Sequence, residues 1–533
     1  MAIATLSQIR NAFFARIQGD QRFPWMILLL LGGVIFCMRL HTYTEPLESD
    51  LTTYAVIGRE LLAGRNLYTD LWDHKPPAIH LTYALALFFC GHGRMAIFSL
   101  GFISAFLTLI GIYQLVRLMT GDGSAALWAA AFWTILCSCL DLQANQPNVE
   151  VFLNVTLVWA FYFLARMGAG SFSPLLAVLS GLLFFAASAY KQIALVPLAM
   201  ASLGYGFVCW RRQGGKGMRA GFANLAIIAA LIISGWLALG GYFKLRGSWD
   251  DFYEAVFLFN RYYGGNLFEN LTNGFQFFLV FPLIMGSCYF LLPLVLLGIT
   301  HASLRPWQSA RVLFLGYLLA APFMIILPGK YYAHYYQLWL VPLILGAGLG
   351  IARLKDIPQA MPQWVIWCVP LSFLVAASLF ELSTYRLSAE EWSMRKYRDV
   401  FIASEKMGEE LNQILKPDET FFQWGWFSGL YFSSHRRPPT GILYSFPLNG
   451  GPLKDKLARR LLSDLKREKP EIIVAAKHES FLLRLHPGLL AWIQENYRKS
   501  TRMDQGIAFW FIRRGGRLEK EWIAPAARKV EDR

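Results

Sequence analysis

The chain has 533 residues, of which 55% are hydrophobic and only 16% are charged, and its mean hydropathy is +0.38. A single hydrophobic core stops growing at about 250–300 residues, so a soluble protein would not need this much apolar sequence. The composition therefore excludes a soluble globular protein and predicts a polytopic α-helical membrane protein. The net charge of +15 then reflects the orientation of the loops and gives no reason to expect a nucleic-acid partner.

Eleven apolar runs are long enough to cross a bilayer, which takes about 17–25 residues. A twelfth run, residues 76–90, is of marginal length. If it does not cross, the basic clusters of the loops all fall on one face, whereas they scatter over both faces if it crosses. The positive-inside rule therefore favours about eleven transmembrane helices, with residues 76–90 as a surface or re-entrant helix. The eleven runs begin near Pro24, Arg94, Ser124, Val149, Pro174, Ile193, Phe222, Phe275, Val312, Tyr335 and Gln363.

This topology predicts a cytoplasmic segment at residues 1–23, a transmembrane module at 24–385 with a first outer loop at 43–92, and an extracytoplasmic region at 386–533. The first apolar run is too long for a cleavable signal. In the last region apolar runs shorten and charges of both signs are interspersed. Strand patterns at 420–424, 471–475 and 507–512 and helical patterns at 388–415, 454–466 and 481–497 predict a small α/β domain there.

The first outer loop contains a short amphipathic pattern. Apolar residues recur at three- and four-residue steps over Leu51–Leu62, which predicts a helix on the membrane surface with its polar face towards water. Ser49 or Asp50 can cap this helix, and Gly64 can end it in the left-handed conformation. Asp50 can equally well accept a proton beside a cavity at the membrane boundary.

Other polar side chains stand at the ends of apolar runs on the same predicted outer face. Lys75, followed by two prolines, can neutralise a phosphate at headgroup depth or simply snorkel to lipid headgroups. Glu150 and Lys191 interrupt apolar sequence, which indicates either a functional cavity or an interface anchor. The remaining candidates for substrate binding are Glu48, Tyr54 and His74 in the first loop, Arg261 among aromatic residues, and Lys330, His334 and Tyr335 in the segment 328–336.

These residues resemble a known family. The early Asp, Tyr54-Ala55, the segment 58–64, Tyr68 and His74-Lys75-Pro76-Pro77 are similar to the first loop of the C-type-fold (GT-C) glycosyltransferases. The resemblance is to the protein O-mannosyltransferase and lipid A aminoarabinose transferase superfamily, in its bacterial branch. Glu150, the segment 189–192 and the segment 330–335 extend it over about residues 20–385.

The resemblance implies a glycosyltransferase of the bacterial cytoplasmic (inner) membrane. Such an enzyme moves a hexose or pentose from a polyprenyl-phosphate donor to a hydroxyl of an envelope acceptor, which is a protein, lipid A or a glycan. The reaction takes place outside the cytoplasm and is expected to invert the anomeric carbon. A carboxylate can serve as the general base for the acceptor hydroxyl, and fixed cations can stabilise the departing phosphate.

By position the resemblance makes Asp50 the catalytic acid of the first loop and Glu150 a second acid of the cavity. It places Lys75, Lys191 and Lys330 near the lipid phosphate. Many relatives carry adjacent Asp and Glu in this loop, whereas here Glu48 precedes Asp50, which leaves Asp50 the better candidate.

No cofactor is implied by these residues. His74 stands where some relatives carry an acid beside the lysine, so no metal site is carried over from them, and a divalent metal stays an open question. All seven cysteines lie in apolar segments, which indicates neither a disulfide framework nor a zinc cluster.

The alternative function is a transporter or flippase for an anionic or lipid-linked solute, which would use the same cations along its path. Such proteins usually contain inverted repeats and helices interrupted near the bilayer midplane. Here no repeat is visible and the polar residues cluster towards one surface, so a transferase is favoured. A non-catalytic membrane scaffold for the C-terminal region is a weaker third interpretation.

Overall fold

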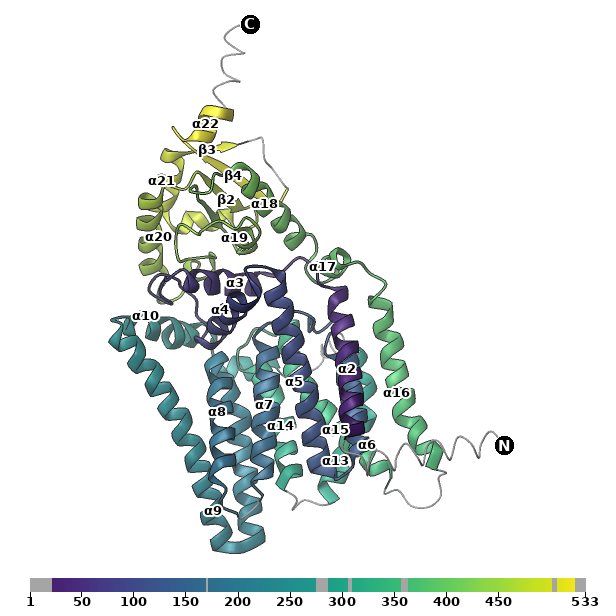
Figure 1. The fold of residues 1–533 in the computed structure, drawn as a ribbon. Helices are drawn as coiled ribbons and strands as arrows, with labels where there is room; N and C mark the ends of the chain where they lie inside the picture. The colour runs from purple at the N-terminus through teal and green to yellow at the C-terminus, as the bar shows by residue number, and fades with distance from the viewer. Residues whose placement is uncertain are drawn as a thin grey trace, which may run out of the picture. The chain divides into compact units, whose positions relative to one another are not determined.

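The computed structural model describes residues 22–168, 171–274, 286–304, 309–355, 363–500 and 506–522. They form two compact units (Figure 1). The first unit contains the chain up to Tyr43, Phe98–Leu239 and Gly264–Ser388, and the second contains Thr44–Ile97, Gly240–Tyr263 and the chain from Ala389 onwards. The predicted cytoplasmic segment, except for residues 22 and 23, lies outside the described residues, as does the start of the run predicted from Phe275.

The first unit is a set of apolar helices. Among the described residues, seven helical segments of the chain are long and apolar enough to cross a membrane, and shorter apolar helices occupy the other predicted runs. Each of the eleven runs thus contains an apolar helix, although the number that crosses stays a prediction. The helices are α2 (Arg22–His41), α5 (Arg94–Thr120), α6 (Gly123–Leu136), α7 (Val149–Arg166), α8 (Pro174–Tyr190), η1 (Gln192–Ala194), α9 (Leu195–Leu245), η3 (Gly286–Leu291), α13 (Leu292–Leu304), α14 (Ser309–Ile326), η4 (Ala333–Tyr336), α15 (Gln337–Leu354) and α16 (Gln363–Thr384).

The chain reverses direction inside α9. Two apolar arms, Gln192–Arg212 and Gly214–Leu245, meet at Gly214, whose φ of +55° suits a glycine. The side-chain amide of Asn224 donates a hydrogen bond to the hydroxyl of Tyr205 over 3.0 Å. In a straight helix these two residues would be about 28 Å apart, since each residue adds about 1.5 Å. The arms therefore form a helical hairpin and match the two runs predicted there.

A buried arginine supports the irregular segment between α6 and α7. Arg39, in the last turn of α2, donates from Nη1 to the carbonyl of Asn145 over 2.7 Å. Its Nη2 donates to the carbonyls of Cys137 and Ala144 over 3.0 and 3.1 Å. Backbone groups outside a helix must find partners when they are buried in a membrane protein. Arg39 supplies three of these partners and so fixes the segment that leads into α7.

The second unit begins with the two helices of the first outer loop, α3 (Ser49–Leu62) and α4 (Ala78–Cys90), which pack against each other. A Cβ added at Gly58 would lie 2.8 Å from the backbone nitrogen of Ala84, so a glycine permits this close approach. With 13 residues, α4 is about 20 Å long, which is short of a bilayer core of about 30 Å. It leaves four exposed apolar side chains, as expected of a helix at a membrane surface: Leu81, Leu85, Phe88 and Phe89.

The C-terminal part of the second unit is built on a four-stranded sheet in the order β1-β2-β4-β3. β1 is parallel to β2, and β4 is antiparallel to both of its neighbours. Every residue of β1 and β2 is buried. The remaining elements of the second unit, of which the first three precede its C-terminal part, are α10 (Trp249–Tyr253), η2 (Glu254–Phe259), α11 (Asn260–Tyr263), α17 (Ala389–Tyr397), α18 (Val400–Ile414), β1 (Phe421–Trp424), α19 (Gly429–Ser433), η5 (Phe446–Leu448), α20 (Lys454–Glu468), β2 (Ile472–Ala476), η6 (Ser480–Leu485), α21 (Pro487–Asn496), β3 (Tyr497–Ser500), β4 (Ala508–Arg513) and α22 (Arg517–Trp522).

Two predicted helices of this region are each divided. The helix predicted over 388–415 is interrupted at Arg398, whose φ of +59° is incompatible with a continuous helix. The helix predicted over 481–497 is interrupted before Pro487, which begins α21 because proline suits the first turn of a helix. The polar strand Tyr497–Ser500 was not predicted, since two of its four residues are exposed and charged.

Candidate functional site

The first turn of α3 carries the candidate base. The N-cap position is occupied by Glu48, which makes no side-chain capping bond, and not by Ser49 or Asp50 as predicted. Asp50 lies in the first turn and is half-buried. The helix ends as predicted, because Gly64 follows it with a φ of +89°.

The polar face of α3 does not point to water as predicted. Thr52 and Thr53 are almost fully buried, and both hydroxyls lie within 2.9 Å of the Ser428 hydroxyl. Ser428 also donates to the carbonyl of Ser49 over 2.8 Å, and the Ser49 hydroxyl donates to the carbonyl of Trp426 over 2.6 Å. The segment after β1 therefore covers the start of α3. The sequence pattern of the helix cannot reveal that residues more than 370 positions away in the chain bury its polar face.

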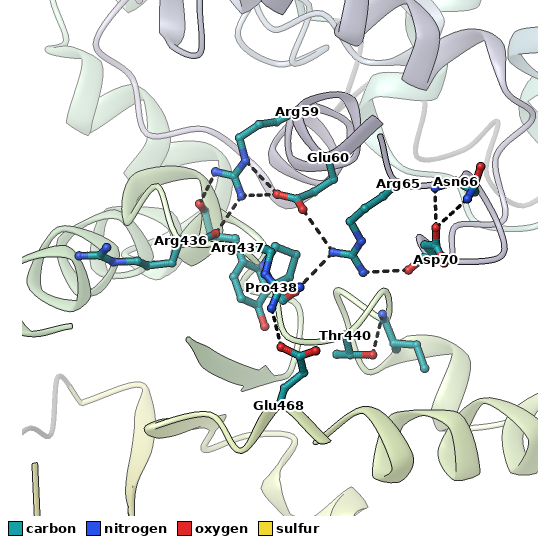
Figure 2. A network of polar contacts seen from close by, with 12 residues as sticks. Arg59, Glu60, Arg65, Asn66, Asp70, Arg436, Arg437, Pro438, Thr440 and Glu468 are labelled. Carbon is teal, nitrogen blue, oxygen red and sulfur yellow. Dashed lines mark hydrogen bonds and ion pairs between the residues drawn. The ribbon is translucent and has the colours of Figure 1, made fainter. Parts of the chain in front are cut away.

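The other end of α3 is joined to the C-terminal part of the unit by a polar network, shown in Figure 2. Glu60 accepts hydrogen bonds from Arg59 and from Arg65, which lie on either side of it. Arg59 also donates to the carbonyls of Tyr431 and Arg436 over 3.2 and 2.8 Å. Such charge-assisted bonds are stronger than neutral ones. The first loop is therefore held by both ends of α3.

A second cluster surrounds Asp73, just before Lys75. Asp73 Oδ1 accepts hydrogen bonds from the His74 amide and from the Tyr444 hydroxyl, both over 2.7 Å. His80 Nε2 lies 3.2 Å from Asp73 Oδ2. Asp73 and His80 are 2% and 0% exposed, so the carboxylate is bound by donors inside the protein. None of these groups except His74 was singled out in the sequence.

Burial and hydrogen bonding set the protonation states of this cluster. Burial alone would raise the pKa of Asp73, but the hydrogen bonds and charges of His74 and His80 outweigh it and hold the pKa well below its usual value. Burial, and then the neighbouring Lys75, lowers the pKa of His74. Burial and the carboxylate of Asp73 raise the pKa of Tyr444 well above its usual value. At neutral pH the cluster therefore contains an ionised Asp73 and a phenol that remains a donor.

Asp50 acts electrostatically on the same cluster. Its carboxylate is one of the charges that favour protonation of His74 and of Tyr444. The backbone around Lys75 is fixed, because the Tyr68 hydroxyl donates to the Lys75 carbonyl over 2.8 Å and Asn260 donates to the His74 carbonyl over 2.7 Å. Within the second unit, the charges of Asp50 and Lys75 therefore both act on His74.

The two glutamates before Asp50 have buried partners. Glu45 forms an ion pair with Lys396, and both side chains are at most 1% exposed. The Tyr397 hydroxyl donates to Glu48 over 3.4 Å. Burial, followed by the charges of Glu48, Glu45 and Asp50, raises the pKa of Tyr397 well above its usual value. The charges of all three acids therefore act on Tyr397, which nothing in its local sequence distinguished.

The other candidates in the second unit differ in exposure. Tyr54 is 1% exposed and packs against His80 and Tyr83, with ring centroids 5.8 and 5.5 Å away. Lys75 is 9% exposed. Arg261, in α11, is exposed and belongs to the same short helix as the Asn260 that binds the His74 carbonyl.

The first unit contains the remaining candidates. Glu150 lies in the first turn of α7 and is 1% exposed, and its Oε1 is 2.9 Å from Lys191 Nζ. Lys191 follows the end of α8, and its Nζ lies 3.6 Å from the centroid of the Tyr335 ring. A buried ion pair capped by an aromatic face is a costly arrangement that requires good geometry. The structure therefore brings three predicted site residues together, from three separate segments.

His334 and Lys330 lie in the segment before α15. His334 Nδ1 is 3.3 Å from Gln143 Oε1, and its ring meets that of Tyr335 edge-on at 4.9 Å. Partial burial lowers the pKa of Lys330. The segment is anchored by Asn270, which donates to the carbonyl of Leu327 over 2.8 Å. That these residues and Asp50 face one pocket stays a prediction.

Comparisons with protein-family models and with curated proteins found no match. Among solved structures, ArnT from Cupriavidus metallidurans bound to undecaprenyl phosphate is similar with a TM-score of 0.56 and 14% identity, over 91% of this chain and 97% of that one. The oligosaccharyltransferase AglB from Archaeoglobus fulgidus, in complex with an inhibitory peptide and a dolichol-phosphate, is similar with a TM-score of 0.52 and 12% identity, over 90% and 72%.

The chain is therefore a polytopic membrane protein with the GT-C fold, as its first loop predicted. Both ArnT, a lipid A aminoarabinose transferase, and AglB are glycosyltransferases with this fold. Within the described part of the chain, no three His, Cys, Asp or Glu side chains are grouped as metal ligands.

Proposed function

We propose that this chain is a membrane glycosyltransferase that moves a sugar from a polyprenyl-phosphate donor to the hydroxyl of an envelope acceptor outside the bacterial cytoplasmic membrane. The observation that carries this proposal is the GT-C fold, shared over 91% of the chain with a structure that holds undecaprenyl phosphate. The roles of the side chains are proposed from their chemistry and from the contacts described above.

In this reaction the acceptor oxygen attacks the anomeric carbon and loses its proton to Asp50. The bond from the anomeric carbon to the phosphate oxygen breaks, and its electron pair leaves with the lipid phosphate. Attack opposite the leaving group inverts the anomeric carbon. Lys75, with support from Arg261, Lys191 and Lys330, stabilises the charge that develops on the phosphate.

The environment of Asp50 supports the role of base. It is the half-buried acid of the first turn of α3, whereas Glu45 and Glu48 are almost fully buried beside Lys396 and Tyr397. A general base must reach the proton that it removes, which favours an acid with some exposure. Glu150 is bound to Lys191, so we assign it to shaping the acceptor or sugar pocket by fixing that lysine.

Conversion of an undecaprenyl-phosphate sugar to undecaprenyl phosphate by the purified chain, followed by mass spectrometry, tests the proposal. Loss of a general base typically costs about 10²–10⁴-fold in rate, so Asp50→Asn should reduce transfer by that factor at unchanged protein abundance. Asp418→Asn, at an exposed acid, is the control and should transfer normally. Transfer by Asp50→Asn at the control rate would remove Asp50 from this role. Movement of intact donor across vesicles without loss of its sugar would favour a flippase instead.

A further inference from the structure

A polar cavity of about 180 Å³ opens in the second unit, beside the turn that carries Asp73. Three segments far apart in the sequence build it: the first loop, α10 with η2, and α20. One water molecule needs about 10–15 Å³ of such space, so the cavity is large enough for a ligand of several heavy atoms, such as a sugar ring. Its lining residues are Thr69, Trp72, Asp251, Glu254, Lys456, Leu457 and Arg460.

The cavity wall is built from fixed side chains. Trp72 is 3% exposed, and its backbone nitrogen donates to the carbonyl of Gly441 over 2.9 Å. Leu457 is also 3% exposed and belongs to the apolar stripe of α20. Arg460 donates to the carbonyl of Tyr68 over 3.2 Å, which holds its guanidinium at the cavity. A wall that is already in place loses little conformational entropy when a ligand binds.

The charges around the cavity balance. Two carboxylates, Asp251 and Glu254, face two cations, Lys456 and Arg460. Lys456 forms ion pairs with both acids, and its side chain remains 48% exposed. An anionic ligand would meet the carboxylates, and a cationic ligand would meet the lysine and the arginine. A hydroxyl both donates and accepts hydrogen bonds, so a neutral polyhydroxylated ring suits acceptors and donors placed side by side.

We propose that this cavity is a binding site for a neutral sugar ring and holds part of a carbohydrate acceptor. Binding of a sugar ring does not depend on the proposed function, whereas the identification of that sugar as the acceptor does. It narrows the acceptor class from protein, lipid A or glycan to an acceptor that presents an uncharged sugar near Asp73.

Saturation-transfer NMR on the full chain in lipid nanodiscs tests the site without detergents that carry sugar headgroups. The probes are methyl α-mannopyranoside and methyl β-glucopyranoside as neutral rings, glucuronate as an anion and glucosamine as a cation. Thr69→Trp fills the cavity from an exposed position, and Lys456→Met removes a hydrogen-bond donor. The matched controls are Arg467→Trp and Arg467→Met, on the same helix at a side chain that is 65% exposed and does not line the cavity.

The expected result is transfer of saturation to at least one neutral ring, with affinity reduced about tenfold or more in both cavity variants and unchanged in both controls. Absence of a signal from both neutral rings, equal signals in all variants, or preference for glucuronate or glucosamine would overturn the proposal. Sugar binding without any transfer by the unmodified chain would contradict the proposed function and leave the site standing.

Discussion

The hydrogen bond from Tyr444 to Asp73 gives the sharpest prediction about the second unit. Tyr444→Phe removes one hydroxyl and leaves the ring. A hydrogen bond to a charged group contributes about 1.5–3 kcal/mol, and the 2.7 Å distance and the 2% exposure of Asp73 indicate a bond in that range. The unfolding equilibrium constant should therefore rise about 10–160-fold.

Tyr497→Phe is the matched control, because the Tyr497 hydroxyl donates over the same 2.7 Å to a neutral acceptor, the carbonyl of Pro470. A neutral hydrogen bond contributes about 0.5–1.5 kcal/mol, so the control should lose less stability. Both free energies of unfolding can be measured by pulse proteolysis in urea, followed through fragments of the second unit. Equal losses in the two variants would refute a bond between the Tyr444 phenol and an ionised Asp73.

Three further predictions concern protonation and buried charge. Burial depresses the pKa of His74, so the neutral form of His74 stabilises the fold above pH about 6.5, and this contribution is lost as the pH falls further. The urea midpoint of unfolding should therefore drop between pH 8 and pH 5, and it should drop less in His74→Asn. Lys191→Met should lower the stability in thermal unfolding by about 3–5 kcal/mol, and adding Glu150→Gln should recover part of that loss. Additive losses in the double variant would show that Lys191 and Glu150 are not coupled. Arg39→Met should cost about 3 kcal/mol or more, because three buried carbonyls lose a charged donor, and near-native thermal stability would contradict that role.

The helices of the first unit were predictable because hydropathy is a local property. Each of the eleven apolar runs contains a helix, and even the reversal at Gly214 follows from a polar, glycine-containing break in the sequence. Span length alone did not set the helix boundaries. α6 ends after 14 residues because Arg39 allows the following irregular segment to be buried.

The candidate site was predictable only in part, because its partners are distant in sequence. Asp50 and Lys75 stood out through their position next to apolar runs. Tyr444 could not be predicted as a partner of Asp73, since 371 positions separate the two residues. The predicted orientation of α3 was wrong for the same reason. The spacing of its apolar residues shows which face packs within the loop, but it cannot show that Ser428 covers the other face.

The division of labour among the acids of the first loop follows from these contacts. Glu60 is bound by two arginines, Asp73 by two histidines and Tyr444, and Glu45 by Lys396. Burying a carboxylate is costly unless such partners compensate, so these acids are needed to hold the loop and are poor candidates for proton transfer. Asp50 is less buried than all three and still acts on the ring of His74. Of these four acids, we therefore expect Asp50, at the start of α3, to be the one available for chemistry.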